Sequence, residues 1–218
     1  MRRRRGSRRA SVGQRGRAVG KEPPRLAASG VLSSASKGPW STISEDSVCR
    51  TPIFELYRRH TRHPRLGARD FYVLQAPPWV NIIPITEAGE VVMVRQFRHG
   101  VGGYTLEIPG GMMDPADASP RAGARREMRE ETGYDSTRIV ELGRVHPNPA
   151  IQPNLCYSFL ARDVRPTGSP DPDEDEETEV ITVGLEKIPR LIADGTITHA
   201  LVIAAFSFLH LYNSPRRP

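Results

Sequence analysis

Cysteine is scarce in this chain, which has only Cys49 and Cys156 among its 218 residues. Two cysteines cannot form a disulfide framework, so the stapled folds of small secreted proteins are excluded and a reducing compartment is indicated. Neither residue has a second cysteine or a histidine at the spacing of a metal site. Both are therefore expected to be structural.

The sequence also lacks a long apolar run. Its most apolar segment, from about His199 to Leu211, is shorter than the ~20 residues that a bilayer-spanning helix needs, and a histidine stands at or near each end. No apolar stretch of the kind found in secretory signals follows the N-terminal arginines. We expect a buried core helix at 199–211, no membrane association and a cytoplasmic protein.

Acidic residues are nearly absent from the first part of the chain. Glu22 is the only one in residues 1–38, and residues 1–50 hold 12 basic and 3 acidic side chains, against 19 and 22 in residues 51–218. Residues 1–38 have too few apolar side chains to fold alone and are expected to be a disordered tail. A nucleic-acid or membrane anchor, an organellar targeting segment, and a start codon placed too early remain open, and we favour the last or a functionless tail. Nucleic acid is not an expected partner, because the remainder is acidic.

From Pro39 onward the composition is that of a folded domain, expected to end at residue 212 before a short tail at 213–218. Segments rich in β-branched and aromatic residues alternate with turn residues, and two helical segments close the chain. This order predicts an α/β or α+β sandwich with a mixed sheet. The expected strands are 71–74, 79–85, 90–97, 104–108, 139–145, 155–161 and 180–185, and the closing helices are 186–193 and 199–211.

A further helix is expected from Pro120 to Thr132. Ser119 is a good N-cap, proline favours the first helical position, and Gly133 ends the helix.

Three carboxylates share one face of this helix. Glu127, Glu130 and Glu131 fall at i, i+3 and i+4, where like charges repel one another unless a cation lies among them. A hard divalent ion, Mg²⁺ or Mn²⁺, prefers such oxygen ligands. Arg126 is placed to pair with Glu130, and the double glycine at Gly110 lets a backbone carbonyl turn toward the same ions. The alternative is a solvated amphipathic helix whose charges only keep it soluble.

The order of the residues favours the metal-binding interpretation. The run from Arg126 to Tyr134 resembles the Nudix box, G-x5-E-x7-R-E-U-x-E-E-x-G-U with U a bulky apolar residue, and matches its seven specified positions there. Upstream the chain departs from the pattern: with Gly111 as the first glycine, Asp117 stands where the family has glutamate, and the next spacer has eight residues instead of seven. The departure leaves the role of the first carboxylate open.

Three flanking runs resemble the ADP-ribose and nucleoside diphosphate sugar pyrophosphatases within the Nudix families. They are Val94–Arg98 ahead of the box, Leu106–Gly111 at its entry, and the proline-bearing loop His146–Pro149 with Gln152-Pro153 beyond it. The resemblance spans about 39–212. It implies an α/β/α sandwich, hydrolysis of a nucleoside diphosphate sugar to a nucleoside monophosphate and a sugar phosphate, and a homodimer.

The resemblance also implies roles for individual residues. Glu127 and Glu131 would be the principal metal ligands, with Glu130 shared and the Gly110 carbonyl as a backbone ligand, while Arg126 orients the carboxylates. Glu107 adds a ligand or an outer contact, or is merely an exposed strand residue. The general base would come from the acidic run 171–179, where Glu177 and Glu179 lie nearest the next strand.

Substrate contacts are assigned to Arg95, Arg98, Trp79 and Pro149. Guanidinium groups pair with phosphate oxygens, but Arg95 and Arg98 are three apart on a strand and so face opposite ways. Trp79 stacks on the nucleobase, with an ordinary core position as the alternative. Two other classes of function remain: a nucleotide sensor without catalysis, and an RNA-directed enzyme that uses the basic tail. The retained glutamates speak against the first and the acidic remainder against the second.

Overall fold

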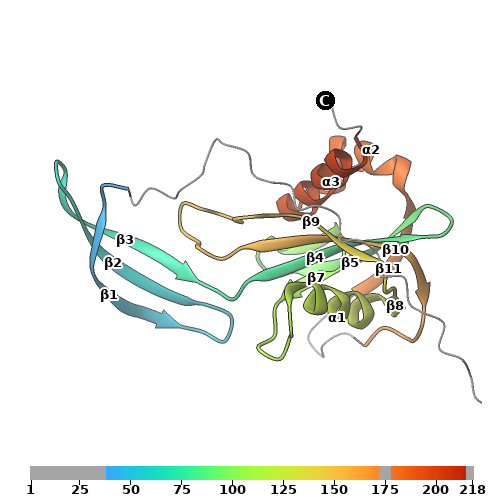
Figure 1. Ribbon diagram of the computed structural model, residues 1–218, viewed down its shortest axis with the longest axis horizontal. Helices are drawn as coiled ribbons and strands as arrows, with labels where there is room; N and C mark the ends of the chain where they lie inside the picture. Colours follow the sequence, from blue (N-terminus) through green and yellow to red (C-terminus); the bar gives the residue numbers. More distant parts are fainter. Residues whose placement is uncertain (1–37, 172–177, 215–218) are drawn as a thin grey trace, which may run out of the picture. The chain divides into compact units, whose positions relative to one another are not determined.

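The computed structural model describes residues 38–171 and 178–214. The chain divides into two units, Met1–Gly38 and Pro39–Pro218, and the described residues lie almost wholly in the second. That unit contains an eight-stranded sheet with helices on both faces and a separate three-stranded sheet (Figure 1).

The larger sheet is mixed. Its main path runs β11-β5-β4-β10-β8, with β6 paired to β5, β7 to β4 and β9 to β10. β4 and β10 are parallel to each other, and the other pairs are antiparallel. The strands are β4 (Trp79–Thr86), β5 (Glu90–Arg98), β6 (Gly103–Glu107), β7 (Gly110–Met112), β8 (Tyr134–Asp135), β9 (Ile139–Val145), β10 (Cys156–Pro166) and β11 (Thr178–Gly184).

Alternate side chains of the central strands enter two different cores, because successive residues of a strand point to opposite faces. Val80 and Ile82 of β4 pack with Ala124 and Met128 of α1 (Pro120–Thr132). The next residue, Ile83, packs on the other face, in the core that the last helices complete. The near-continuous apolar character of β4 follows from this double burial.

The second face is covered by the C-terminal segment. A short 3-10 turn, η1 (Leu185–Lys187), leads into α2 (Ile188–Ala193) and α3 (Ala200–Asn213), and Figure 1 shows α1 on one side of the sheet with α2 and α3 on the other. Val202, Ala205 and Leu209 of α3 are buried in this core. The predicted α/β/α sandwich is confirmed, as are α1 with its predicted bounds and a closing core helix. None of the helices in the described ranges is long and apolar enough to cross a bilayer.

The three-stranded sheet was largely missed by the sequence analysis. It consists of β1 (Ser41–Arg50), β2 (Glu55–His63) and β3 (Gly67–Gln75), and only part of β3 was predicted. All ten residues of β1 are exposed, so this strand lacks the alternation of apolar and polar residues that reveals a half-buried strand. Instead, ion pairs such as Arg58–Asp46 link it to β2. Its existence depends on a partner strand that local patterns do not indicate.

Candidate active site

Local interactions fix both ends of α1, and a long-range contact attaches the loop after β10 to it. Ser119 Oγ accepts a hydrogen bond from the Ala122 N–H at 3.2 Å, and Gly133 ends the helix with φ 71°. A side chain at Gly133 would be strained in this left-handed conformation and would clash with the Gly168 carbonyl oxygen. The Asp171 N–H donates to the Glu130 carbonyl at 2.7 Å. The acidic run that begins at residue 171 therefore starts beside the end of α1.

Two of the box glutamates lie against the glycines of β7. The Gly110 N–H donates to Glu131 Oε2 at 3.1 Å, and Glu131 is only 3 % exposed. A Cβ on Gly111 would be 2.8 Å from Glu127 Oε1, so the absence of a side chain lets that carboxylate approach the backbone. Glu130 is different, since 43 % of its side chain is exposed.

Arg126 is the cation at the centre of the acidic groups. Its guanidinium donates to Glu130 at 2.7 Å and to Glu127 at 2.9 Å, and it also makes two bonds to Asp117, at 3.2 and 3.1 Å. The hydrogen bonds from Arg126 hold the pKa of Asp117 below its usual value, and the same contacts raise the pKa of Arg126. Asp117, the position that departs from the box pattern, therefore anchors the arginine that holds two of the glutamates.

A glycine inside α1 allows this anchoring. A Cβ on Gly123 would be 2.7 Å from Asp117 Oδ2, so only a residue without a side chain lets Asp117 lie against the helix. Glycine inside a helix costs roughly 0.5–1 kcal/mol relative to alanine, and the close approach of Asp117 accounts for its presence. This role was not predicted from the sequence, although an unexplained glycine in a helical pattern was the available signal.

Glu107 is buried, contrary to the alternative of an exposed strand residue. It is 3 % exposed and receives two hydrogen bonds from Arg98, at 2.9 and 2.8 Å, and one from Thr105 at 2.5 Å. Burial disfavours its charge, but the Arg98 guanidinium more than offsets burial, and the pKa of Glu107 lies below its usual value. In the strand register Glu107 opposes Val94, so alternation places Glu107 and Arg98 on the α1 side of the sheet.

The remaining predicted residues are not gathered beside α1. Arg95 binds Glu179 at 3.2 Å and lies over the Tyr104 ring at 4.2 Å. Alternation along β5 and β11 places this pair on the face that α2 and α3 cover.

Trp79 is half-buried at the start of β4 and, by the same alternation, faces α3 rather than α1. Pro149 is exposed in the loop between β9 and β10. Glu177 lies outside the described residues.

The groups around Glu127 and Glu131 have the chemistry that a divalent ion requires. Carboxylate oxygens and a glycine backbone suit a hard cation, and the approach of Glu127 to Gly111 requires a position without a Cβ. Within residues 38–171 and 178–214, no three histidine, cysteine or acidic side chains are arranged as a ready-made metal site. Arg126 donates to Glu127 and Glu130 in this arrangement, so those two carboxylates are turned toward a guanidinium. The residues therefore fit the ion by their chemistry. The carboxylates lie near one another but do not all point toward one common position.

Comparison with known proteins identifies this architecture. A family model described as the NUDIX domain matches residues 76–206. The chain belongs to the Nudix family. The match begins before β4 and ends within α3, so it includes both helix layers and the carboxylates of α1.

Named Nudix relatives agree with this assignment. The chain is 27 % identical over 171 residues to the ADP-ribose pyrophosphatase of Bacillus subtilis, covering 78 % of this chain and 92 % of that one. It is 33 % identical over 189 residues to the ADP-sugar pyrophosphatase of Mus musculus, covering 78 % and 79 %. A crystal structure of an ADP compounds hydrolase superposes with a TM-score of 0.71 at 21 % identity, covering 79 % and 93 %, and shows the shared fold. The chain is a Nudix pyrophosphatase, and Nudix hydrolases generally depend on divalent metal ions.

Proposed function

We propose that this enzyme hydrolyses the diphosphate bond of ADP-ribose or a related nucleoside diphosphate sugar in the presence of Mg²⁺, giving a nucleoside monophosphate and a sugar phosphate. The observation that supports this proposal is the position of Glu127 and Glu131. Both lie on the helix that bears the family's signature and pack against Gly111 and Gly110, respectively. The names of the relatives, ADP-ribose pyrophosphatase and ADP-sugar pyrophosphatase, supply the substrate class.

The metal would be held by Glu127 and Glu131, with Glu130 and the Gly110 carbonyl as further ligands. When bound, Mg²⁺ would neutralise the diphosphate charge and acidify a coordinated water. Mn²⁺ has the same preference for oxygen ligands and is the expected substitute.

Arg126 orients the carboxylates and is not itself proposed as a ligand. Its bonds to Asp117, whose side chain is 7 % exposed, fix the guanidinium, which then limits the positions of Glu127 and Glu130. Pre-positioned carboxylates need less rearrangement when an ion binds, which is the general advantage of preorganised sites.

Arg98 is the better candidate for a substrate phosphate contact than Arg95. It lies on the α1 side of the sheet, and its two bonds to Glu107 fix the orientation of the guanidinium. Arg95 pairs with Glu179 on the opposite face, together with Tyr104. We retain Trp79 and Pro149 as proposed contacts for the nucleobase. Neither lies beside α1, so they would reach the base through a partner subunit or through movement of the loop that carries Pro149.

The general base is assigned to the acidic run 171–179. The bond from the Asp171 N–H to the Glu130 carbonyl attaches the start of this run to α1. Glu179 is directed to Arg95, so we favour Glu177 over Glu179 for the base.

We also propose a homodimer that uses the sheet β1–β3. Phe71 and Tyr72 are neighbours on β3, point to opposite faces, and are 46 % and 54 % exposed, so both faces of this sheet present aromatic surface. A three-stranded sheet gains stability by covering a hydrophobic face, and a second copy would provide that cover. We place the enzyme in the cytoplasm, in keeping with two free cysteines.

The deciding experiment is a substrate panel assayed with and without Mg²⁺. ADP-ribose, GDP-mannose, UDP-glucose, NADH, diadenosine polyphosphates and capped RNA would be compared by the phosphate released after phosphatase coupling. The expected result is the largest kcat/KM for a nucleoside diphosphate sugar, absolute dependence on the metal, and loss of turnover in Glu131→Gln.

Turnover in Glu131→Gln near the parent rate, with the fold intact by circular dichroism, would remove that carboxylate from the site. A preference for capped RNA would replace the proposed substrate class.

A further inference from the structure

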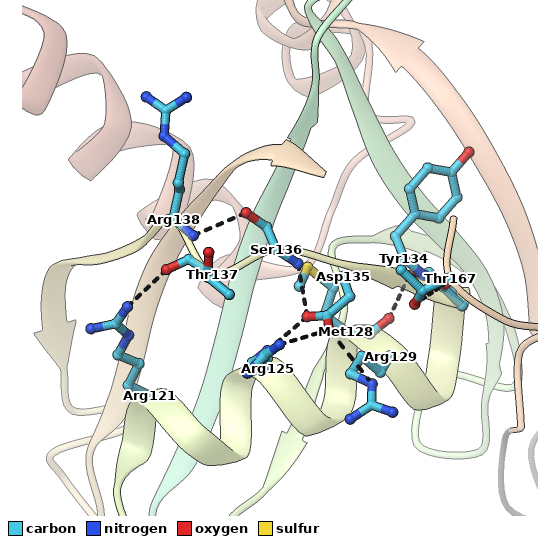
Figure 2. A network of polar contacts seen from close by, with 12 residues as sticks. Arg121, Arg125, Met128, Arg129, Tyr134, Asp135, Ser136, Thr137, Arg138 and Thr167 are labelled. Atoms are coloured by element: carbon cyan, nitrogen blue, oxygen red, sulfur yellow. Dashed lines mark hydrogen bonds and ion pairs between the residues drawn. The ribbon is translucent and has the colours of Figure 1, made fainter. Parts of the chain in front are cut away.

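The two sides of α1 carry opposite charge. Arg121, Arg125 and Arg129 follow one another at four-residue spacing and form one stripe, here called the basic flank. Glu127 and Glu131 are here called the acidic flank. Arg125 stands two residues before Glu127, and Arg129 stands two residues before Glu131. A two-residue step turns about 200° around a helix. The basic flank therefore lies away from the proposed catalytic carboxylates and beside β8 and the segment that follows it, as Figure 2 shows.

Among the described residues, Asp135 is the one carboxylate that pairs with arginines of the basic flank. Arg125 makes a two-pronged bond to Asp135, at 2.7 and 2.8 Å, while Arg129 reaches the same carboxylate only at 3.9 Å. Arg121 donates to the Thr137 carbonyl at 3.0 Å, and no acidic side chain of the described residues pairs with it. Three guanidinium charges thus share one negative charge, an excess of two, and the dashed contacts in Figure 2 trace this arrangement.

An open groove of about 430 Å³ runs along the basic flank. Its lining combines these arginines and Arg126 with hydroxyl groups of Ser119, Ser136 and Thr137. Arg129 also borders a second groove of about 370 Å³, whose lining includes Arg126, Glu130 and Asp171 together with Thr167, Gly168 and Ser169 beyond the end of the helix. The first groove is therefore lined by cationic side chains without an acidic one, whereas the second carries both basic and acidic side chains.

We propose that the basic flank binds the phosphate groups of a small ligand that carries a di- or triphosphate chain. Guanidinium forks and hydroxyl groups are the usual donors to phosphate oxygens. Arg121 and Arg129 are eight residues apart, about 12 Å along the helix, so a chain of phosphates can engage both where one phosphate cannot. Asp135 already occupies Arg125 between them, which leaves the two ends of the stripe to take the ligand.

None of the three arginines of the basic flank has been placed in the catalytic machinery, although Arg126, which orients the carboxylates, also lines this groove. A ligand there would contact the helix that carries Glu127 and Glu131 from its other side. Binding can therefore be measured without turnover and without a divalent ion.

The test is a titration of the isotope-labelled full-length chain with sodium tripolyphosphate, free of metal, followed by the backbone amide signals of Ala122, Arg129 and Thr137 in NMR spectra. These amides report on the groove itself, so ligand that binds the arginine-rich residues 1–38 does not enter the result. We expect saturable chemical-shift changes in the parent. Arg121→Gln or Arg129→Gln should weaken the affinity for tripolyphosphate about tenfold, because each removes one charge-assisted contact. Inorganic phosphate should bind at least about tenfold more weakly, because it spans only one of the two end arginines.

Arg190→Gln is the matched control, because it removes the same charge from an exposed arginine of α2 on the other face of the sheet. It should leave the affinity within about twofold, and Glu131→Gln should leave groove binding intact. Equal affinity in the parent and an Arg121→Gln/Arg129→Gln double variant of unchanged melting temperature would overturn the proposal. So would loss of binding in Glu131→Gln, or a short single-stranded RNA that binds these arginines more than about tenfold more tightly than tripolyphosphate.

Discussion

The acidic and basic flanks of α1 differ in how their side chains are held. On the acidic flank, Glu131 is 3 % exposed and bonded to a backbone N–H, and Glu127 lies against Gly111. On the basic flank, Arg129 is 61 % exposed and reaches its carboxylate only at 3.9 Å. One helix thus offers a fixed surface suited to chemistry and an adjustable surface suited to binding. Backbone contacts, more than charge, therefore distinguish the proposed catalytic groups from the proposed binding groups.

Neutralising one residue on each flank should give the largest contrast. Glu127→Gln removes a proposed metal ligand and should lower kcat/KM about 1,000-fold, equivalent to about 4 kcal/mol of transition-state stabilisation. Arg121→Gln should change it less than about twofold, because that side chain bonds to the segment between β8 and β9 and lies away from β7. Steady-state kinetics on ADP-ribose at saturating Mg²⁺ measure kcat/KM for both variants. Comparable losses of kcat/KM in the two variants would show that the two flanks do not differ in their roles.

Arg126 lies between the flanks, and its removal should have the next largest effect. Arg126→Ala leaves Asp117, Glu127 and Glu130 without their shared cation, so their repulsion should spread the carboxylates. We expect a fall in kcat of about 100-fold and a higher Mg²⁺ concentration at half-maximal rate. Arg126→Lys should recover only part of the loss, because one ammonium cannot reproduce the forked contacts to three carboxylates. A rate and metal dependence unchanged in Arg126→Ala would show that the glycines of β7 alone position the glutamates.

How far the sequence could predict these arrangements depended on whether the signals were local. The bounds of α1 were predicted correctly because Ser119, Pro120 and Gly133 act on adjacent backbone groups. The sandwich followed from the order of the apolar segments. Strands β1 and β2 were missed because their stability comes from each other and from charged pairs.

Partners in a different element of the fold account for the remaining differences between the predicted and the observed site. The burial of Glu107 depends on Arg98 from the neighbouring strand, and the role of Asp117 depends on Gly123, six residues along the chain. Neither pairing can be predicted from the helix or strand periodicity of the sequence. The assignment of Glu177 and the nature of residues 1–37 concern residues outside the described ranges and stay predictions.

Two aspartates that contact α1 have a pKa lowered by an arginine, which predicts a shared response to acid. The Arg125 guanidinium lowers the pKa of Asp135 on the basic flank, and Arg126 does the same for Asp117. A lowered folded-state pKa stabilises the fold above the unfolded pKa of about 3.9, and this stabilisation is lost as pH falls through the lower folded value. Asp135→Asn should therefore reduce the free energy of unfolding by about 1 kcal/mol at pH 7 and flatten its decline below about pH 4.

Urea unfolding across pH 2–7 measures this response, and activity separates the flanks. Asp117→Asn should show the same flattening and also lower kcat, because it loosens Arg126, whereas Asp135→Asn should leave kcat near the parent value. A loss of rate in Asp135→Asn as large as in Asp117→Asn would show that the basic flank also supports the chemistry.

Deleting residues 1–38 should have the smallest effect on catalysis. The deletion removes 11 basic residues and one acidic residue, yet the family match begins only at residue 76. We expect kcat/KM for a nucleoside diphosphate sugar to stay within about twofold, since long-range charge effects are screened over about 8 Å at physiological salt. The same deletion should abolish any salt-sensitive RNA affinity that the full chain has, because phosphate contacts of a basic tail release counterions. A large rate loss on deletion, persisting at 0.5 M salt, would show that the tail contacts the enzyme specifically, and the contrast between the flanks would then not account for all the activity.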